Sequence, residues 1–122
     1  MKNFKELEIW QKGHEMAIDI FNLTKTFPSE EKYGLISQMR RSSQSVPTNI
    51  AEGCGRNSQK ELLRFCSIAM GSASELEYQL ILSKDIGFIK THDYKDTNEK
   101  LLTLKKMLNA FMKYLRTQTP NT

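Results

Sequence analysis

The sequence is poor in the features that mark secreted and membrane proteins. Its 122 residues include two cysteines, Cys54 and Cys66, which form no C-x-x-C pair. A single disulfide would be unusual in a chain long enough to bury its own core, so we expect two reduced thiols. The first residues lack a signal peptide's apolar run, and no apolar stretch approaches the ~20 residues that span a bilayer. We therefore expect a cytoplasmic protein that does not enter a membrane.

Patterns typical of catalysis and metal binding are also missing. The two histidines, His14 and His92, have no glutamate or second histidine at the spacing of a bundle metal site. No glycine-rich phosphate loop is present, and the serines near Pro47 have no histidine base within helical reach. We predict that the protein is not an enzyme and holds no metal or cofactor. His14 is expected in the core or at an interface, because it falls on the predicted apolar face of its helix.

Helical patterning is abundant. Apolar residues recur at alternating steps of three and four in four segments, the spacing that gives a helix one buried face. The predicted helices span residues 7–25, 30–52, 59–86 and 92–117. Their connections are short, which favours an all-α, antiparallel up-down-up-down four-helix bundle with residues 1–122 in a single domain.

The first and last helices have the clearest predicted core faces. In the first helix the face consists of Leu7, Trp10, His14, Ala17, Phe21 and Thr24, and Ile9, Met16 and Ile18 widen it. In the last helix it consists of Leu101, Leu104, Leu108, Phe111 and Leu115. Both faces follow the a/d spacing of packed bundle helices.

Several residues signal helix ends and a kink. Ser29 is expected to cap the second helix, and Ser58, with a glutamate three residues later, to cap the third. Pro47 lies inside the second helix, where it lacks an N–H and crowds the carbonyl of Ser43, so we expect a kink there. Gly53 is expected to end that helix.

Part of the second predicted helix carries a family resemblance. The segments YGL at 33–35, SQMRRS at 37–42 and NIAEG at 49–53 resemble the signature of four-helix bundle proteins encoded in 23S rRNA intervening sequences. EYQL at 77–80 and KDIGFI at 84–89 are similar to the same family, and the resemblance covers roughly residues 4–115.

The resemblance implies a four-helix bundle that assembles as a ring, typically a homopentamer. Related accessory proteins of diversity-generating retroelements are basic and bind nucleic acid and a reverse transcriptase. The resemblance therefore implies that this chain associates with itself, and that RNA, DNA or a reverse transcriptase is a further partner.

The charge permits a polyanion partner. The chain carries 18 Lys and Arg against 14 Asp and Glu, for a net charge of +4. Helical projection places four basic residues in one band on the last helix: Lys105, Lys106, Lys113 and Arg116. A second basic group brackets the turn between the second and third helices: Arg40, Arg41, Arg56, Lys60 and Arg64. For one subunit these are solvated faces, whereas a ring would repeat them into a collar that attracts polyanions.

Arg40 and Arg41 have two interpretations. The first is bidentate contact with phosphate. The second is a salt bridge to Glu52, or to Glu75 or Glu77 of the third helix or of a neighbouring subunit. The position of Arg40 beside the apolar stripe favours the second interpretation.

Two sets of site residues follow. The predicted nucleic-acid-binding residues are Lys105, Lys106, Lys113, Arg116, Arg41, Arg56, Lys60 and Arg64. The predicted structural and interface residues are Arg40, Pro47, Asn49, Glu52, Gly53 and Tyr78. Small side chains at 69–74 of the third helix are expected to let another helix come close, within the bundle or from a neighbouring subunit.

We therefore expect a self-associating accessory protein that holds RNA or structured DNA by phosphate contacts, with little reading of bases. The alternative is a structural oligomer or protein-interaction scaffold that binds no nucleic acid. A third possibility is an amphipathic role at a membrane surface.

Overall fold

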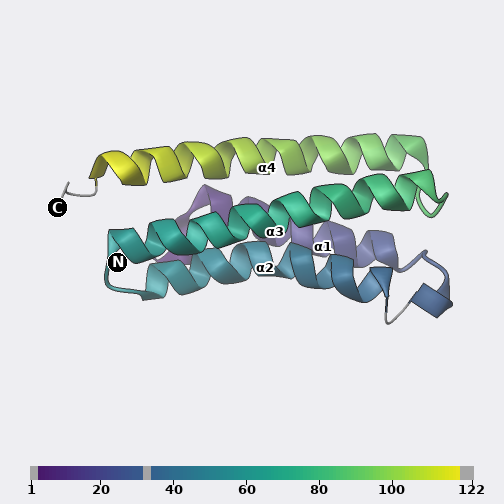
Figure 1. Cartoon of the computed structure of the whole chain (residues 1–122), viewed down its shortest axis with the longest axis horizontal. Coiled ribbons are helices and arrows are strands. Elements are labelled where there is room, and N and C mark those ends of the chain that lie inside the picture. The colour runs from purple at the N-terminus through teal and green to yellow at the C-terminus, as the bar shows by residue number, and fades with distance from the viewer. Residues whose placement is uncertain (1–2, 32–33, 119–122) are drawn as a thin grey trace.

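The computed structural model describes residues 3–31 and 34–118, and over these residues all regular structure is helical. The long helices are α1 (Glu8–Thr24), α2 (Leu35–Gly55), α3 (Gln59–Asp85) and α4 (Thr91–Gln118), and short 3₁₀ turns lie at Phe4–Glu6 and Ser29–Glu31. The four helices lie side by side and alternate in direction along the bundle (Figure 1). The predicted all-α, antiparallel four-helix bundle is confirmed. No helix of this part of the chain is both long and apolar enough to cross a membrane.

The bounds of α1, α3 and α4 lie within one residue of the predicted ones, but those of α2 do not. This helix begins at Leu35, five residues later than predicted. Ser29 does not cap it, because Ser29–Glu31 forms a separate 3₁₀ turn. Gly34, with φ −104° and ψ −110°, holds the backbone out of helical geometry immediately before Leu35. By contrast, Ser58 caps α3 as predicted, since its side chain accepts a hydrogen bond from the Glu61 amide at 3.0 Å.

Gly53 lies inside α2 and does not end it, so the predicted helix end is wrong. The helix continues to Gly55. A Cβ atom on Gly53 would lie 2.9 Å from both Leu62 Cδ1 and Phe65 Cβ of α3. Glycine is therefore required here by the close approach of α2 and α3 just before their connection.

The predicted face of α1 is only partly buried: Leu7 and Thr24 are buried, whereas Trp10, His14, Ala17 and Phe21 are half-buried or exposed. The buried residues of the helix are Ile9, Gly13, Met16, Ile20 and Thr24. His14 is exposed, and the side chain of Phe21 is 51% exposed. A Cβ on Gly13 would lie 3.4 Å from Val46 Cγ1 and 3.5 Å from Pro47 Cδ, so α1 turns its glycine toward the proline of α2. This packing rotates several aromatic residues of α1 to the surface.

The core faces of the other helices are close to the prediction. In α4 the buried residues are Leu101, Leu104, Leu108, Met112 and Leu115, with Met112 replacing the predicted Phe111. Between α2 and α3 the core contains polar contacts, since Ser42 Oγ donates to Gln79 Oε1 at 2.6 Å and Ser83 Oγ lies 3.3 Å from Met39 Sδ. Within α3, Ser83 Oγ also donates to the Gln79 carbonyl at 2.7 Å. Buried hydroxyl and amide groups that are satisfied in this way fix the register of two helices.

Candidate binding surfaces

The antiparallel order of the helices gathers basic residues at one end of the bundle. The C-terminal half of α4 ends beside the connection between α2 and α3 (Figure 1). We define the basic end by five exposed residues of these segments: Arg56, Lys60, Arg64, Lys113 and Arg116. Members of the two groups of cations that were predicted on separate helices thus lie toward the same end of the bundle.

Charge is unevenly divided along the bundle axis. The segments nearest the basic end, residues 3–13, 47–70 and 112–118, carry seven Lys and Arg and four Glu. The remaining described residues carry nine Lys and Arg and ten Asp and Glu. The positive excess of the described chain therefore lies at the basic end, while the rest of the bundle is close to neutral.

Part of the basic end is compensated by ion pairs. Arg56 lies 3.0 Å from Glu52, and Arg64 lies 3.0 Å from Glu61. The hydrogen bond from Arg64 lowers the pKa of Glu61, which stays ionised at neutral pH. Both guanidinium groups also lie near the ring of Phe65, 5.1 Å and 4.5 Å from its centroid.

Lys60, Lys113 and Arg116 remain available at the basic end, since no ion pair joins them to any other residue that the structure describes. Lys106, also predicted to bind nucleic acid, is exposed near the middle of α4. These cations are the ones that phosphate groups reach without breaking an existing pair.

Two predicted parts of the basic surface lie elsewhere. Lys105 Nζ lies 2.7 Å from Glu77 Oε1, and both side chains are half-buried between α4 and α3. Arg40 and Arg41 lie in the first half of α2, about 22–24 Å along the helix axis from Arg56. Lys105 is therefore not part of the basic surface of α4. Arg40 and Arg41 are likewise separate from Arg56, Lys60 and Arg64, with which they were grouped in the prediction.

Arg40 joins α2 to α1 through hydrogen bonds. Its Nε donates to Thr24 Oγ1 at 2.9 Å, and its Nη2 donates to the Phe21 carbonyl at 3.3 Å. The guanidinium carbon lies 3.9 Å from the centroid of the Phe21 ring. The intrachain salt bridge predicted for Arg40 is wrong, because none of the acids that the structure describes pairs with it.

The outward faces of α1 and α2 form a groove of about 490 Å³ that the sequence did not predict. We call it the aromatic groove and define it by Phe4, Trp10, His14 and Phe21 on one wall and Arg40 and Pro47 on the other. Trp10 stacks on His14 with 5.1 Å between ring centroids, and Phe4 meets Trp10 edge-on at 5.0 Å. The residues of α1 in this wall form a second row with the same three-and-four spacing as the buried face. That second row is the sequence signal that could have predicted the groove.

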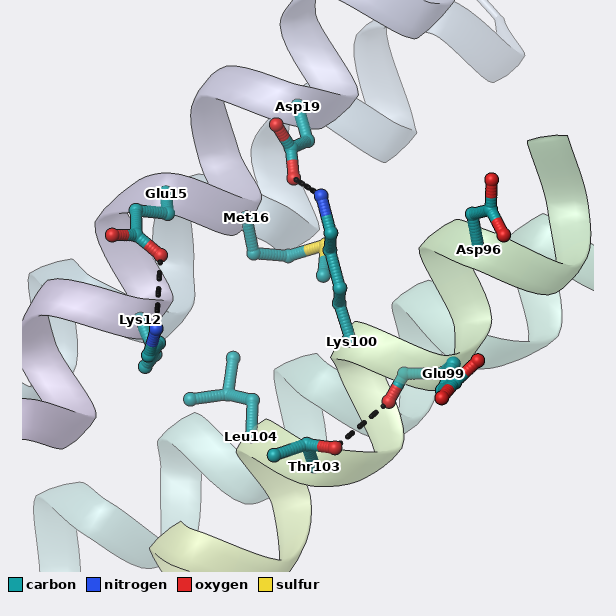
Figure 2. A pocket seen from close by; sticks show the side chains of 9 residues that line it. All are labelled: Lys12, Glu15, Met16, Asp19, Asp96, Glu99, Lys100, Thr103 and Leu104. Atoms are coloured by element: carbon teal, nitrogen blue, oxygen red, sulfur yellow. Dashed lines mark hydrogen bonds and ion pairs between the residues drawn. The ribbon is translucent and has the colours of Figure 1, made fainter.

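A second groove, of about 640 Å³, lies between α1 and α4 (Figure 2). Met16 and Leu104 line its apolar part, and Lys100 reaches from α4 across to Asp19 of α1, 3.5 Å away. The rest of its rim carries Lys12 and three more carboxylates: Glu15, Asp96 and Glu99. Four carboxylates against two ammonium groups would repel phosphate, so we do not expect a polyanion at this groove.

An exposed, partly apolar row runs along α3. We call it the α3 stripe, and it consists of Ile68, Gly71, Glu75, Tyr78 and Leu82, at steps of three and four. Tyr78, predicted at an interface, is 61% exposed. A Cβ on Gly71 would meet nothing within 4 Å. Nothing within the protomer therefore requires glycine at that position.

The remaining predicted residues have local roles. The side-chain amide of Asn49 donates to the Ser45 carbonyl at 2.8 Å and to Ser45 Oγ at 2.9 Å, so it bonds within α2.

Cys54 and Cys66 are buried thiols and do not form a disulfide, as predicted. Burial raises the pKa of Cys66 from 9.0 to about 12, which disfavours its thiolate form. The described residues contain no group of three side chains suited to hold a metal ion.

Comparison with known proteins identifies a family and similar solved structures. The family model of the 23S rRNA-intervening sequence protein matches residues 5–110. Among solved structures, the chain is similar to a crystal structure from Bacteroides thetaiotaomicron of a protein with unknown function from the S23 ribosomal protein family. The two share 29% identity with a TM-score of 0.80, over 86% of this chain and 95% of that one. No curated protein matches the chain.

Proposed function

This chain belongs to the 23S rRNA-intervening sequence protein family, as its motifs predicted, and we propose that it is a self-associating protein that binds nucleic acid. In this proposal the protein is not an enzyme, and RNA or structured DNA contacts its basic end. The observation that carries the proposal is that the C-terminal end of α4, which carries Lys113 and Arg116, lies at the same end of the bundle as the α2–α3 connection (Figure 1), where Arg56 caps α2 and Lys60 and Arg64 lie in the first two turns of α3.

Phosphate contacts are the proposed source of affinity. Lys60, Lys113 and Arg116 offer charge that is not already compensated by an ion pair with a described residue. Binding of phosphates by such cations releases counterions and depends little on sequence. If the protein forms a ring, the basic end of each subunit is repeated around the axis, which raises the local field beyond that of one chain.

Tyr114 favours unpaired over fully duplex nucleic acid. It follows Lys113 on α4, and its side chain is 51% exposed. Its ring lies 6.4 Å from that of Phe111, at the same end of α4 as Lys113 and Arg116. An exposed aromatic ring near phosphate-binding cations is a platform on which an unpaired base stacks, and such stacking tolerates any base. The preferred ligand is therefore a structured RNA or DNA that includes a single-stranded loop or end.

A salt titration tests the proposal. We expect a labelled hairpin with a single-stranded loop to bind, with the logarithm of the association constant falling linearly with the logarithm of salt concentration. Each phosphate contact contributes roughly −0.7 to −0.9 to the slope. Three exposed cations per subunit predict a slope steeper than about −2. An absence of binding at low salt, or binding that does not respond to salt, would rule out phosphate contacts.

The second candidate function is a structural oligomer or protein-interaction scaffold without nucleic-acid binding, with a reverse transcriptase or another protein as its partner. The ion pairs of Arg56 with Glu52, of Arg64 with Glu61 and of Lys105 with Glu77 favour it, because they satisfy three of the predicted nucleic-acid-binding residues internally. The same titration separates the two functions, since a scaffold would show no salt-sensitive binding to RNA.

A further inference from the structure

We propose that the groove between α1 and α4 binds a basic amphipathic helix of a partner protein. We call it the acidic groove and define it by Met16 and Leu104 at its floor and by Glu15, Asp19, Asp96 and Glu99 at its rim. The partner helix carries a row of apolar residues that faces the floor, with lysines or arginines on both sides of the row. This inference goes beyond the proposed function, because it involves neither nucleic acid nor the basic end.

The packing of the helices leaves the acidic groove open. A Cβ on Gly13 would lie 3.4 Å from a side-chain atom of α2, so α1 packs closely against α2. On the other side of the bundle, α4 packs chiefly against α3. The single ion pair between the described helices α1 and α4 joins Lys100 to Asp19, at 3.5 Å. A groove of about 640 Å³ therefore remains between them, down to the buried side chains of Met16 and Leu104 (Figure 2).

Two of the four rim carboxylates have no explanation within the protomer. Asp96 and Glu99 are exposed, and neither forms an ion pair with a described residue. They lie beyond the first turn of α4, which begins at Thr91, so the helix dipole does not favour acids at these positions. At a spacing of three residues on one helix, like charges also repel each other. A cationic partner would explain both positions, because it would neutralise two acids that otherwise weaken the helix.

The arrangement of the rim argues against other ligands. Each wall carries two carboxylates, Glu15 and Asp19 on α1 and Asp96 and Glu99 on α4. With only two ammonium groups among them, they would repel a polyanion. A single metal ion is not expected either, since the described residues contain no group of three side chains suited to hold one. The ligand that fits is an extended one with several separate cations.

The length of the acidic groove matches about two turns of a helix. Lys12 to Asp19 spans about 10 Å of α1, and Asp96 to Leu104 about 12 Å of α4. A helix that lies in a groove between two others inserts apolar residues at steps of three and four. Lysine and arginine beside that row cover apolar surface with their stems and hold their charges at the rim. Acids on both walls therefore select a helix with cations on both flanks.

Lys100 shows how a cation occupies the acidic groove. It extends from α4 across to Asp19 of α1, and the two side chains are 67% and 38% exposed (Figure 2). An exposed ion pair of this kind contributes little to stability. A cation of the partner would therefore replace Lys100 at Asp19 without a large loss. Lys100 thus competes with the partner for that carboxylate.

Binding of a designed peptide tests the proposal. The probe is a fluorescent peptide of about 18 residues, long enough to form a helix in water, with leucines at steps of three and four and lysines on both sides of them. A scrambled peptide of the same composition is the control. Fluorescence anisotropy with the nuclease-treated whole chain should give a dissociation constant in the micromolar range for the designed peptide. The scrambled peptide should bind at least roughly tenfold more weakly.

Variants of the rim locate the contact. Asp96→Asn with Glu99→Gln should weaken peptide binding roughly tenfold, because two ion pairs across the interface are lost. Glu30→Gln with Asp85→Asn is the matched control, since both acids are exposed and lie outside the acidic groove, and it should change the affinity less than about twofold. Lys100→Gln should tighten binding by roughly threefold, because it frees Asp19. Circular dichroism checks that each variant keeps its helices.

Any of five results would overturn the proposal. The first is no binding of the designed peptide at concentrations up to about 1 mM. The second is equal affinity for the scrambled peptide, which would reduce the contact to attraction between charges. The third is equal affinity of the two double variants, and the fourth is weaker binding by Lys100→Gln. The fifth is a lower light-scattering mass of Asp96→Asn with Glu99→Gln than of wild type, which would assign the acidic groove to a second copy of the chain.

Discussion

Gly53 of α2 and Phe65 of α3 approach so closely that a Cβ atom on Gly53 would lie 2.9 Å from Phe65 Cβ. The glycine ends the NIAEG segment, and its position inside α2 gives that segment a packing role. It brings α2 and α3 together just before the connection that carries Arg56. The basic end is therefore built on a close contact between two helices.

Gly53→Ala is expected to destabilise the fold by about 1–3 kcal/mol, the usual effect of adding atoms to a filled core. Chemical denaturation followed by circular dichroism measures the change. Gly55→Ala is the matched control, because its added methyl group meets nothing within 4 Å and should leave stability unchanged or slightly raised. A neutral Gly53→Ala would show that the helices separate without loss, contrary to the packing described.

Arg40→Ala should weaken folding before it weakens RNA binding. The change removes the hydrogen bonds to Thr24 and to the Phe21 carbonyl, and should lower the free energy of unfolding by about 1–3 kcal/mol. In a double-mutant cycle with Thr24→Val, the two effects should be less than additive, because both changes break the same bond. If Arg40→Ala kept its stability and lost RNA affinity, Arg40 would be a phosphate contact and the structural interpretation would be wrong.

Stability should fall at high pH because of Cys66. Burial raises its pKa from 9.0 to about 12, so between these values the unfolded chain loses a proton that the folded chain keeps. The contribution is fully present below pH 9 and is lost as the pH rises toward 12, at about 1.4 kcal/mol per pH unit. Cys66→Val should show a shallower decline over this range in denaturation measured at several pH values. Equal slopes for the two proteins would contradict the assignment.

Local signals in the sequence were sufficient for much of the fold. Spacing and caps placed α1, α3 and α4 within one residue of their bounds. For α2, Ser29 has the residue type of a cap, but the backbone angles of Gly34, which local composition does not specify, delay the helix. The orientation of α1 could not be predicted, because two of its faces have the same spacing. The contact of Gly13 with Pro47, which belongs to tertiary packing, decides between them.

The residues of the candidate site could be predicted from the sequence, but which of them lie near one another could not. Charge counts identified the cations, whereas the antiparallel order of the helices decides which of them meet. Lys105 has the right position on α4 for the predicted band, yet it pairs with Glu77 of α3. Arg41 has the right charge, yet it lies far along α2 from Arg56. Such pairings depend on contacts between distant segments, and the spacing of one helix contains no information about them.

The most direct test of nucleic-acid binding at the basic end compares two variants with the same change in charge, one near each end of α4. One carries Lys113→Glu and Arg116→Glu at the basic end of α4, and the other carries Lys90→Glu and Lys95→Glu at the opposite end of the bundle. Fluorescence anisotropy with a labelled RNA hairpin gives the dissociation constant of each at one salt concentration. We expect the first variant to bind roughly tenfold more weakly than the second, or weaker still, because it places acids where phosphates would lie. Equal dissociation constants would contradict the proposed site.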